Sequence, residues 1–418
     1  MGLYANKMPE NRRDGANRGQ GMSAGHADTA RRSMSLLNNP AVRAYAVQAV
    51  VLIVLLWAGY EVVKNTLANL DKLNKNFGFD FFIQTAGFDI LQSLIGYSSS
   101  SNYGRALMVG LLNTLMVAVI GVFFATILGF TAGIMRLSRN WLVAKVATIY
   151  VETVRNIPLL LQMFIWYGLV LKPLPDPRNA ISIFDSIFLT QKGIFIPAPI
   201  FGQGAWIAAV FLAAAIAAAV AIRIWAKRRQ EATGQQFPHL LTGIALVVLA
   251  PIAGLAIAGW PLTWDMPVLG TGFIKNFSGG LPFYPEFVAM VLALSIYTGA
   301  FIAEIVRAGI LAVSHGQTEA AHALGLRHGP TLRLVIIPQA LRVIIPPLAS
   351  QYLNLTKNSS LATAIGYPDL VHIGGVVNNQ SGRILEVVLI WMVIYLTLSL
   401  LTSGVMNWYN ARKKLVER

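Results

Sequence analysis

The sequence predicts an all-α integral membrane protein with about eight transmembrane helices, and two observations support this fold class. The 418-residue chain is 55% hydrophobic and only 12% charged, whereas soluble domains are about 25% charged. Its apolar residues also gather in runs that approach or exceed the roughly 20 residues needed to cross a bilayer. Backbone groups in lipid must be hydrogen-bonded internally, so these runs are expected to be helices. The eight runs are residues 44–64, 106–133, 146–171, 205–226, 240–260, 285–310, 337–354 and 384–406.

The first run follows a long polar tail. Residues 1–40 are rich in Gly, Asn and Arg, a composition typical of disordered segments. The run itself starts too late and is too long for an ordinary cleaved signal peptide, so we expect a retained anchor. Residues 1–43 are thus predicted to be a cytoplasmic tail, and residues 44–105 an extra transmembrane helix with a periplasmic segment.

The seventh run is the least regular of the eight, because Arg342, Pro346 and Pro347 interrupt it. A proline inside a helix removes one backbone hydrogen bond. Neighbouring helices can satisfy the freed carbonyl in a membrane protein. We therefore expect a kink in residues 337–354 rather than a break.

The distribution of basic residues predicts the topology. With eight spans and the N-terminus inside, the inside segments (1–43, 134–147, 223–239, 304–342 and 407–418) carry 22 Lys and Arg, and the outside segments (64–105, 172–204, 261–284 and 357–383) carry 10. This asymmetry is the positive-inside pattern, which places both termini, including the tail 411–418, in the cytoplasm. The net charge of +15 is thus mostly topological and does not indicate a nucleic-acid partner.

Three outside segments stand out by composition. Residues 64–105 contain FGFDFF and AGFDIL, residues 172–204 are rich in Pro, Ile and Phe, and residues 261–284 are rich in Gly, Pro and aromatics. They could form a surface that receives a soluble extracytoplasmic partner. Alternatively, they pack on the membrane interface and on neighbouring helices.

One inside segment, residues 311–338, has the features of a helix–turn–helix. Ser314 and Gln317 have the S-x-x-Q spacing of a capping box, which predicts a helix starting near His315. The alanine-rich residues that follow favour a helix, and Gly325 is suited to end it in the left-handed conformation. A second helix then enters the membrane through Pro338.

The chain lacks the sequence motifs of several common chemistries. It has no Cys, so disulfide and thiol chemistry are excluded. It also lacks a Gly-Lys dipeptide and therefore a Walker A phosphate loop, and it has neither an H-E-x-x-H metal motif nor a G-x-S-x-G elbow. We expect no catalytic site, no metal and no cofactor in this chain.

Four charged residues lie within or at the ends of two spans. Glu152 and Arg155 are three residues apart, and so are Glu304 and Arg307, a spacing that brings side chains together on a helix. Isolated charges at mid-bilayer cost roughly 2.5–3.5 kcal/mol each on insertion scales, so pairing is expected. They could be structural ion pairs, or they could line the translocation route or its inner gate.

A zwitterionic substrate would need a cation for its carboxylate and an acceptor for its ammonium group. Arg155 with Asn156, and Glu152 or Glu304, could supply both. Further candidates near the outer end of the seventh span are Asn354, Lys357 and Asn358. Lys357 could equally extend its ammonium group to the interface from a helix end.

The inside segment also carries a recognisable pattern. Residues Glu319-Ala320-Ala321, then Gly325, then Val335-Ile336-Ile337-Pro338 resemble the E-A-A-x3-G-x9-I-x-L-P loop of ATP-binding-cassette (ABC) importer permeases. The resemblance implies that this helix docks on a separate ATP-binding subunit. Glu319 would be a charged contact, Ala320 and Ala321 a close-packing surface, and Gly325 the turn before Pro338.

Two further stretches resemble polar amino-acid permeases. Residues 150–162, YVETVRNIPLLLQ, are similar to the signature Y-x-E-x-x-R-x-T-P-L-L-x-Q, with Ile157 in place of Thr and Gln162 at its end. Residues 297–310, YTGAFIAEIVRAGI, and 355–366, LTKNSSLATAIG, match the late spans of the same family. Together the resemblance covers roughly residues 106–171 and 285–410 and implies a type I ABC importer core.

The chain is longer than a typical member of that family, because it adds the first span and a hairpin, 205–260, inserted into the permease domain 106–410. With AGFDI and NYGRALMVGLLNTL, it resembles the Q-type permease subunit of proteobacterial general L-amino-acid importers. This resemblance implies a cell inner-membrane location, L-amino-acid substrates, a second homologous permease subunit, a periplasmic amino-acid-binding protein and two ATP-binding subunits that hold ATP and Mg.

Two other classes of function find less support in the sequence. A self-sufficient secondary transporter or channel would be expected to have functional acids deep in the membrane and often internal repeats. The few charges in the spans cluster near their inside ends, so no functional acid is evident deep in the membrane. No internal repeat is evident either. A membrane-embedded enzyme or scaffold finds little support in six His residues without a catalytic constellation.

Overall fold

The computed structural model describes residues 40–72, 77–271 and 276–413. The chain divides into two units, residues 1–77 and 78–418, and each is described by itself. Within these residues, seven helices are long and apolar enough to cross a membrane, or eight if one sharply bent helix pair counts as a span. The predicted helical class of about eight spans is therefore confirmed.

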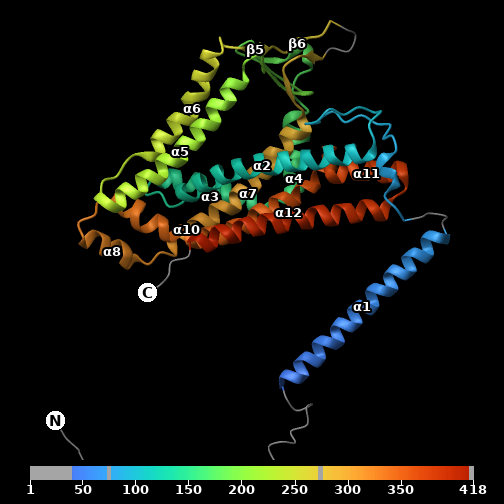
Figure 1. The fold of residues 1–418 in the computed structure, drawn as a ribbon, viewed down its shortest axis with the longest axis horizontal. Helices are drawn as coiled ribbons and strands as arrows, with labels where there is room; N and C mark the ends of the chain where they lie inside the picture. Colours follow the sequence, from blue (N-terminus) through green and yellow to red (C-terminus); the bar gives the residue numbers. More distant parts are fainter. Residues whose placement is uncertain (1–39, 73–76, 272–275, 414–418) are drawn as a thin grey trace, which may run out of the picture. The chain divides into compact units, whose positions relative to one another are not determined.

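The elements follow one another along the chain as shown in Figure 1. The α-helices are α1 (Pro40–Lys72), α2 (Tyr103–Met135), α3 (Trp141–Asn156), α4 (Leu159–Phe164), α5 (Trp206–Thr233), α6 (His239–Ile257), α7 (Pro285–Leu311), α8 (His315–Ala323), α9 (His328–Thr331), α10 (Ile337–Asn358), α11 (Leu370–Ser381) and α12 (Ile384–Lys413). The 3-10 helices are η2 (Asp80–Ile83), η4 (Pro177–Asn179) and η6 (Ser359–Ile365), and the π-helical segments are η3 (Ile165–Leu171) and η5 (Leu332–Ile336).

Among the described residues of the first unit lies one helix, α1, which contains the predicted first span, 44–64. The apolar side chains of α1 are exposed along its length, as expected for a helix whose surroundings are lipid or other helices. The expectation of disorder for residues 1–40 falls almost entirely on residues 1–39, which lie outside the described part of the chain.

The core of the second unit is built where α2, α7 and α10 pack together. Small residues allow the backbones to approach closely, as is common between membrane helices. A side chain on Gly133 of α2 would lie 2.7 Å from the carbonyl oxygen of Ala303 on α7. Gly309 on α7 is likewise covered by Ile344 of α10. This packing fixes the ends of α2, α7 and α10 relative to one another.

The third predicted span, 146–171, is not one continuous helix. The helical axis bends by 107° between α3 and the segment formed by α4 and η3. The bend lies at Ile157, which has φ −99° and ψ 123°, because a residue before proline is disfavoured in the α region. The amide nitrogen Nε2 of Gln162 donates hydrogen bonds to the carbonyl oxygens of Val154 and Ile157, both at 2.9 Å. Gln162 thus stabilises the break.

The seventh span is helical throughout. α10 continues through Pro346 and Pro347, so these prolines do not break the span, as expected. At its start it is joined to α9 through the π-helical turn η5. A π-turn is often found at functional positions of a helix.

The segments 172–204 and 261–284 contain short strands, which the sequence analysis did not predict. The strands are β1 (Ile181–Ile183), β2 (Ile187–Thr190), β3 (Gly193–Ile196), β4 (Ala198–Phe201), β5 (Leu262–Asp265), β6 (Val268–Leu269), β7 (Phe277–Ser278) and β8 (Leu281–Phe283). They form an antiparallel sheet in the order β1-β2-β3-β8 and two pairs, β4-β5 and β6-β7.

The inserted hairpin consists of α5 and α6, which pack against each other. The β4-β5 pair, with Phe201 opposite Leu262, joins the strand that precedes α5 to the strand that follows α6. Figure 1 shows this strand pair at one end of the hairpin and the turn between α5 and α6 at the other end, toward α8.

Candidate functional site

The helix predicted near His315 is present as α8, His315–Ala323, with Ser314 at the N-cap position. The expected capping box is not formed, because the Ser314 side chain makes no capping hydrogen bond. The Gln317 side chain instead accepts a hydrogen bond from Nε2 of Gln339 on α10, at 3.1 Å. The residue that was expected to close the cap therefore ties α8 to α10.

Gly325 ends α8 as predicted. It has φ +77°, in the left-handed region that glycine adopts without steric cost. The backbone N–H of Gly325 donates to the carbonyl of His322 at 2.9 Å, and that of Leu326 donates to the carbonyl of Ala321 at 3.1 Å. These two bonds define a Schellman motif, which satisfies carbonyls at the end of the helix. The chain then turns toward α9, η5 and Pro338.

The exposed side of α8 carries Glu319 and Ala320. The Glu319 side chain is 72% exposed, and its Oε1 lies 3.0 Å from Nδ1 of His315. Ala320 is exposed, whereas Ala321 is only 3% exposed. The two alanines therefore differ in role: Ala320 is available to a partner, while Ala321 packs α8 against its own chain, where α8 contacts η5. Pro338 is exposed at the start of α10.

A second candidate site is a cluster of charged side chains centred on Glu304 of α7. Its Oε1 is 2.9 Å from Nη2 of Arg307, the expected pair within one helix. Its Oε2 bonds Nη1 of Arg136 and lies 3.8 Å from Nη1 of Arg155. Three guanidinium groups from three segments of the chain thus share one carboxylate.

Glu152 does not pair with Arg155, contrary to the sequence-based expectation. Its Oε1 instead lies 3.1 Å from Nη2 of Arg136, and the guanidinium of Arg155 stacks 5.2 Å from the ring centroid of Phe301. The local spacing rule failed because α2 ends beside α3 and α7 and brings a third cation between them.

Arg136 is the residue that sequence reasoning missed. It directly follows α2 and has a side chain only 9% exposed, bridging Glu304 and Glu152. In the sequence it reads as one of the basic residues that flank a span on the inside. The available signal was its position directly at the end of the second apolar run, where a charge must find a partner or reach water.

The cluster of Arg136, Glu152, Arg155, Glu304 and Arg307, called the Glu304 cluster below, contains three cations and two anions. It therefore has a net charge of +1. The Nε atoms of Arg155 and Arg307 are buried without a hydrogen-bond partner among the described residues. A buried donor without a partner is costly, so the cluster has unused capacity to bind an anionic group such as a carboxylate.

Of the remaining candidates, Asn156 borders this cluster and the others lie apart from it. Asn156 is exposed and donates from Nδ2 to the carbonyl oxygen of Glu152 at 2.7 Å, while Gln162 is engaged at the helix break. Asn354, Lys357 and Asn358 occupy the far end of α10. Thirteen residues separate Ile344, which packs on Gly309, from Lys357, or about 20 Å along a helix.

Comparison with known proteins shows the family to which the chain belongs. The family described as "Binding-protein-dependent transport system inner membrane component" matches residues 232–415. The chain is 52% identical over 384 residues to the general L-amino acid transport system permease protein AapQ of Rhizobium johnstonii, covering 92% of this chain and 95% of the relative.

Two other relatives match a similar share of the chain. The chain is 49% identical to the putative amino-acid ABC transporter permease protein YhdX of Escherichia coli, covering 91% of this chain and 96% of the relative. It is 45% identical to the glutamate/glutamine/aspartate/asparagine transport system permease protein BztB of Rhodobacter capsulatus, covering 92% and 96%. The chain, a multi-pass membrane protein, therefore belongs to the family of binding-protein-dependent transport system inner membrane components, the ABC transporter permeases.

Proposed function

We propose that this chain is the membrane-spanning permease subunit of an ABC importer that takes up L-amino acids. Substrate would be delivered by a periplasmic amino-acid-binding protein, and a separate pair of ATP-binding subunits would hold ATP and Mg and supply the energy. The chain is 45–52% identical to three amino-acid permeases over nearly its full length, which supports this substrate class. A second, homologous permease subunit would complete the membrane channel.

The observation that carries the proposal is the exposed helix α8. It is held to α10 by the Gln317–Gln339 bond, ended by the Schellman motif at Gly325, and presents Glu319 and Ala320 outward. A short helix with a small exposed residue and one exposed acid suits a groove on another protein. We infer that α8 docks on the ATP-binding subunit and passes its movement through η5 and Pro338 to α10.

The Glu304 cluster suits an inner gate on the substrate path. Its net positive charge and unpartnered Nε donors favour an amino-acid carboxylate, while the half-exposed Glu152 is the acid placed to accept an ammonium group. Asn156 lies beside it. Asn354, Lys357 and Asn358, at the far end of α10, would form a separate polar region nearer the entrance.

The orientation follows from the distribution of Lys and Arg. The inside segments carry 22 of these residues and the outside segments carry 10, which favours cytoplasmic termini and a cytoplasmic α8. The location would be the cell inner membrane. The strand-containing segments then face the periplasm, where the binding protein delivers substrate.

The proposal is tested by ATP-driven uptake into proteoliposomes that hold the assembled importer and its binding protein. The double substitution Glu319→Lys, Gly325→Asp should abolish uptake of labelled L-amino acids without reducing assembly of the membrane subunits. Glu231→Lys is the matched control, because Glu231 is an exposed acid on α5 that pairs with Lys227 of the same helix. It should transport normally. Normal uptake by the double variant would refute coupling through α8.

A further inference from the structure

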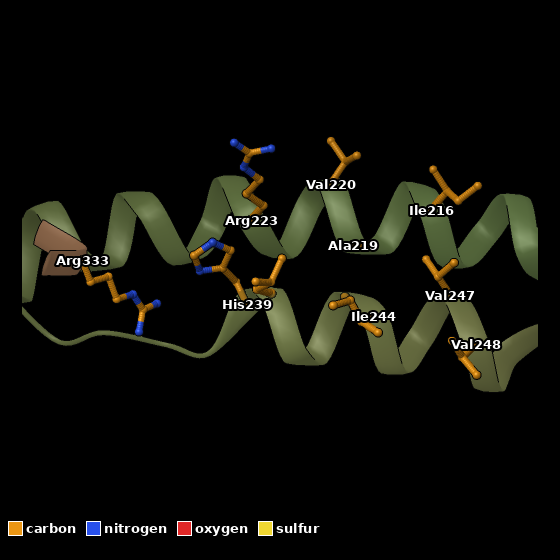
Figure 2. A pocket seen from close by; sticks show the side chains of 11 residues that line it. Ile216, Ala219, Val220, Arg223, His239, Ile244, Val247, Val248 and Arg333 are labelled. Carbon is orange, nitrogen blue, oxygen red and sulfur yellow. The ribbon is translucent and has the colours of Figure 1, made fainter. Parts of the chain in front are cut away.

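A groove on the inserted hairpin lies outside the two candidate sites described above. It runs along α5 and α6 and has a volume of about 580 Å³. Small residues form its floor, since a side chain on Gly243 would meet Ala219 at 3.4 Å. Figure 2 shows aliphatic side chains along most of its length, and these are Ile216, Val220, Ile244, Val247 and Val248.

One end of this groove is cationic. Arg223 of α5, His239 at the start of α6 and Arg333 of η5 line it together, and Figure 2 shows them at the same end, where the chain turns from α5 to α6. None of the described residues that line the groove is acidic. Within the described part of the chain, neither Arg223 nor Arg333 forms an ion pair, and Glu231 in the same turn pairs with Lys227 at 3.7 Å.

The position of the groove limits what can occupy it. Trp206–Thr233 and His239–Ile257 are both candidate membrane spans, so the aliphatic part faces hydrocarbon and the cationic end lies toward a membrane surface. Unpaired arginines at a span end are stabilised by an anion at the headgroup level. Basic pockets between membrane helices are known to hold anionic lipid headgroups.

We propose that this groove binds an anionic phospholipid. The phosphate would lie among Arg223, His239 and Arg333, and an acyl chain would follow the groove toward Val248. His239 and Val248 are nine residues apart, or about 14 Å along a helix, which is long enough for much of an acyl chain. The two arginines at one end favour an occupant that carries an anionic group at the membrane surface, which an entirely apolar helix does not.

The lipid would join two parts of the molecule. Arg333 belongs to η5, between α8 and α10, whereas Arg223 and His239 belong to the inserted hairpin. A phosphate held by all three would therefore tie the hairpin to the segment that follows α8. The hairpin would thereby act as a lipid-dependent support for that segment.

Native mass spectrometry of the purified full chain, titrated with phosphatidylglycerol or phosphatidylcholine, tests the proposal. The wild-type chain should bind phosphatidylglycerol preferentially. Because each basic residue near a membrane surface contributes about 1 kcal/mol to anionic lipid binding, Arg223→Gln with Arg333→Gln should weaken binding roughly 30-fold. The matched control is Arg228→Gln with Arg342→Gln, two exposed cations outside the groove, which should retain wild-type binding. Equal loss in both double variants, or equal binding of the two lipids, would overturn the proposal.

The apolar part needs its own test. Val220→Trp fills the groove, while Val210→Trp places the same side chain on another face of α5, and both positions are exposed. Only the first should weaken phosphatidylglycerol binding, by several-fold. Inorganic phosphate that competes fully with the lipid would contradict a role for the groove.

Photo-crosslinking identifies the occupant in the native membrane. A photoreactive side chain introduced at Ile244, an exposed residue of the groove, should yield lipid adducts in the assembled importer. Adducts of polypeptide size instead would show that a protein helix covers the groove and would overturn the lipid assignment.

Discussion

At the scale of single residues, Glu304 is held by several partners. Its carboxylate contacts the guanidinium groups of Arg307, Arg136 and Arg155, and it is only 27% exposed. Removing one partner of a partly buried network leaves the other charges uncompensated. The free energy of unfolding should therefore depend strongly on this carboxylate.

Replacing Glu304 with Gln keeps the size of the side chain and removes its charge. We expect Glu304→Gln to destabilise the chain by about 2 kcal/mol or more. Glu152→Gln should cost only about 0–1 kcal/mol, because that carboxylate is half-exposed with a single ionic partner. The thermal unfolding midpoint of each purified variant in detergent measures the difference. Equal midpoints for the two variants would contradict the central place of Glu304.

A second unusual carboxylate belongs to Asp369, before α11. Its Oδ1 accepts a hydrogen bond from the backbone N–H of His372 at 2.7 Å and so caps the helix. Its Oδ2 is buried with no hydrogen-bond partner among the described residues. Burial raises the pKa of Asp369 to about 7. Between the ordinary pKa of an Asp carboxyl and this raised pKa, Asp369 therefore carries a proton in the folded chain that it has lost in the unfolded chain.

The sign of the pH dependence follows from this raised pKa. Between about pH 4, the ordinary pKa of Asp, and about pH 7, the folded state binds more protons than the unfolded state, so stability falls as pH rises. Asp369→Asn keeps an N-cap acceptor and should flatten this slope, measured as unfolding midpoints across the range. Asp89→Asn, at an exposed carboxylate, should keep the wild-type slope. An unchanged slope in Asp369→Asn would show that this group titrates normally.

At the scale of elements, α8 owes its length to Gly325. The left-handed φ of +77° is strained for any residue with a side chain, although no neighbouring atom lies within 4 Å of the added Cβ. Gly325→Ala should therefore weaken the end of α8 by about 1 kcal/mol through backbone strain alone.

Hydrogen exchange measures this effect directly. The amides of α8 should exchange faster in Gly325→Ala than in the wild-type chain. Gly316→Ala is the control within the same helix, where φ is not positive and open space surrounds the Cβ. It should leave exchange unchanged or slow it, because alanine favours the helix. Faster exchange in both variants would show that the Schellman motif does not set the stability of α8.

At the scale of the whole molecule, hydropathy and charge predicted the spans because the bilayer imposes length and polarity on each helix separately. The end of α8 was predicted because glycine is favoured at a left-handed C′ position, whereas its start was predicted correctly although the expected capping box does not form. The 107° bend after α3 was missed, although Ile157-Pro158 was the signal, because an apolar run does not show the direction of its helix.

Features that depend on several segments of the chain were not predicted from the sequence. The Glu304 cluster joins the ends of α2, α3 and α7, so the role of Arg136 appears only when these helices are packed. Gln162 was read as a pathway residue, yet its amide donates to two carbonyls at the helix break. The strands β4 and β5 pair across about 60 intervening residues of the inserted hairpin, a distance that period-2 patterns in strands of four residues cannot reveal.

Coupling of this chain to a separate ATPase is tested most directly by what is recovered with it. The tagged chain would be purified from native membranes in mild detergent, and its companions identified by mass spectrometry. Recovery of an ATP-binding subunit and a second, similar permease, with the ATP-binding subunit lost in the Glu319→Lys, Gly325→Asp variant and kept in Glu231→Lys, is the predicted result. Recovery of the wild-type chain alone, even after mild crosslinking, would contradict it.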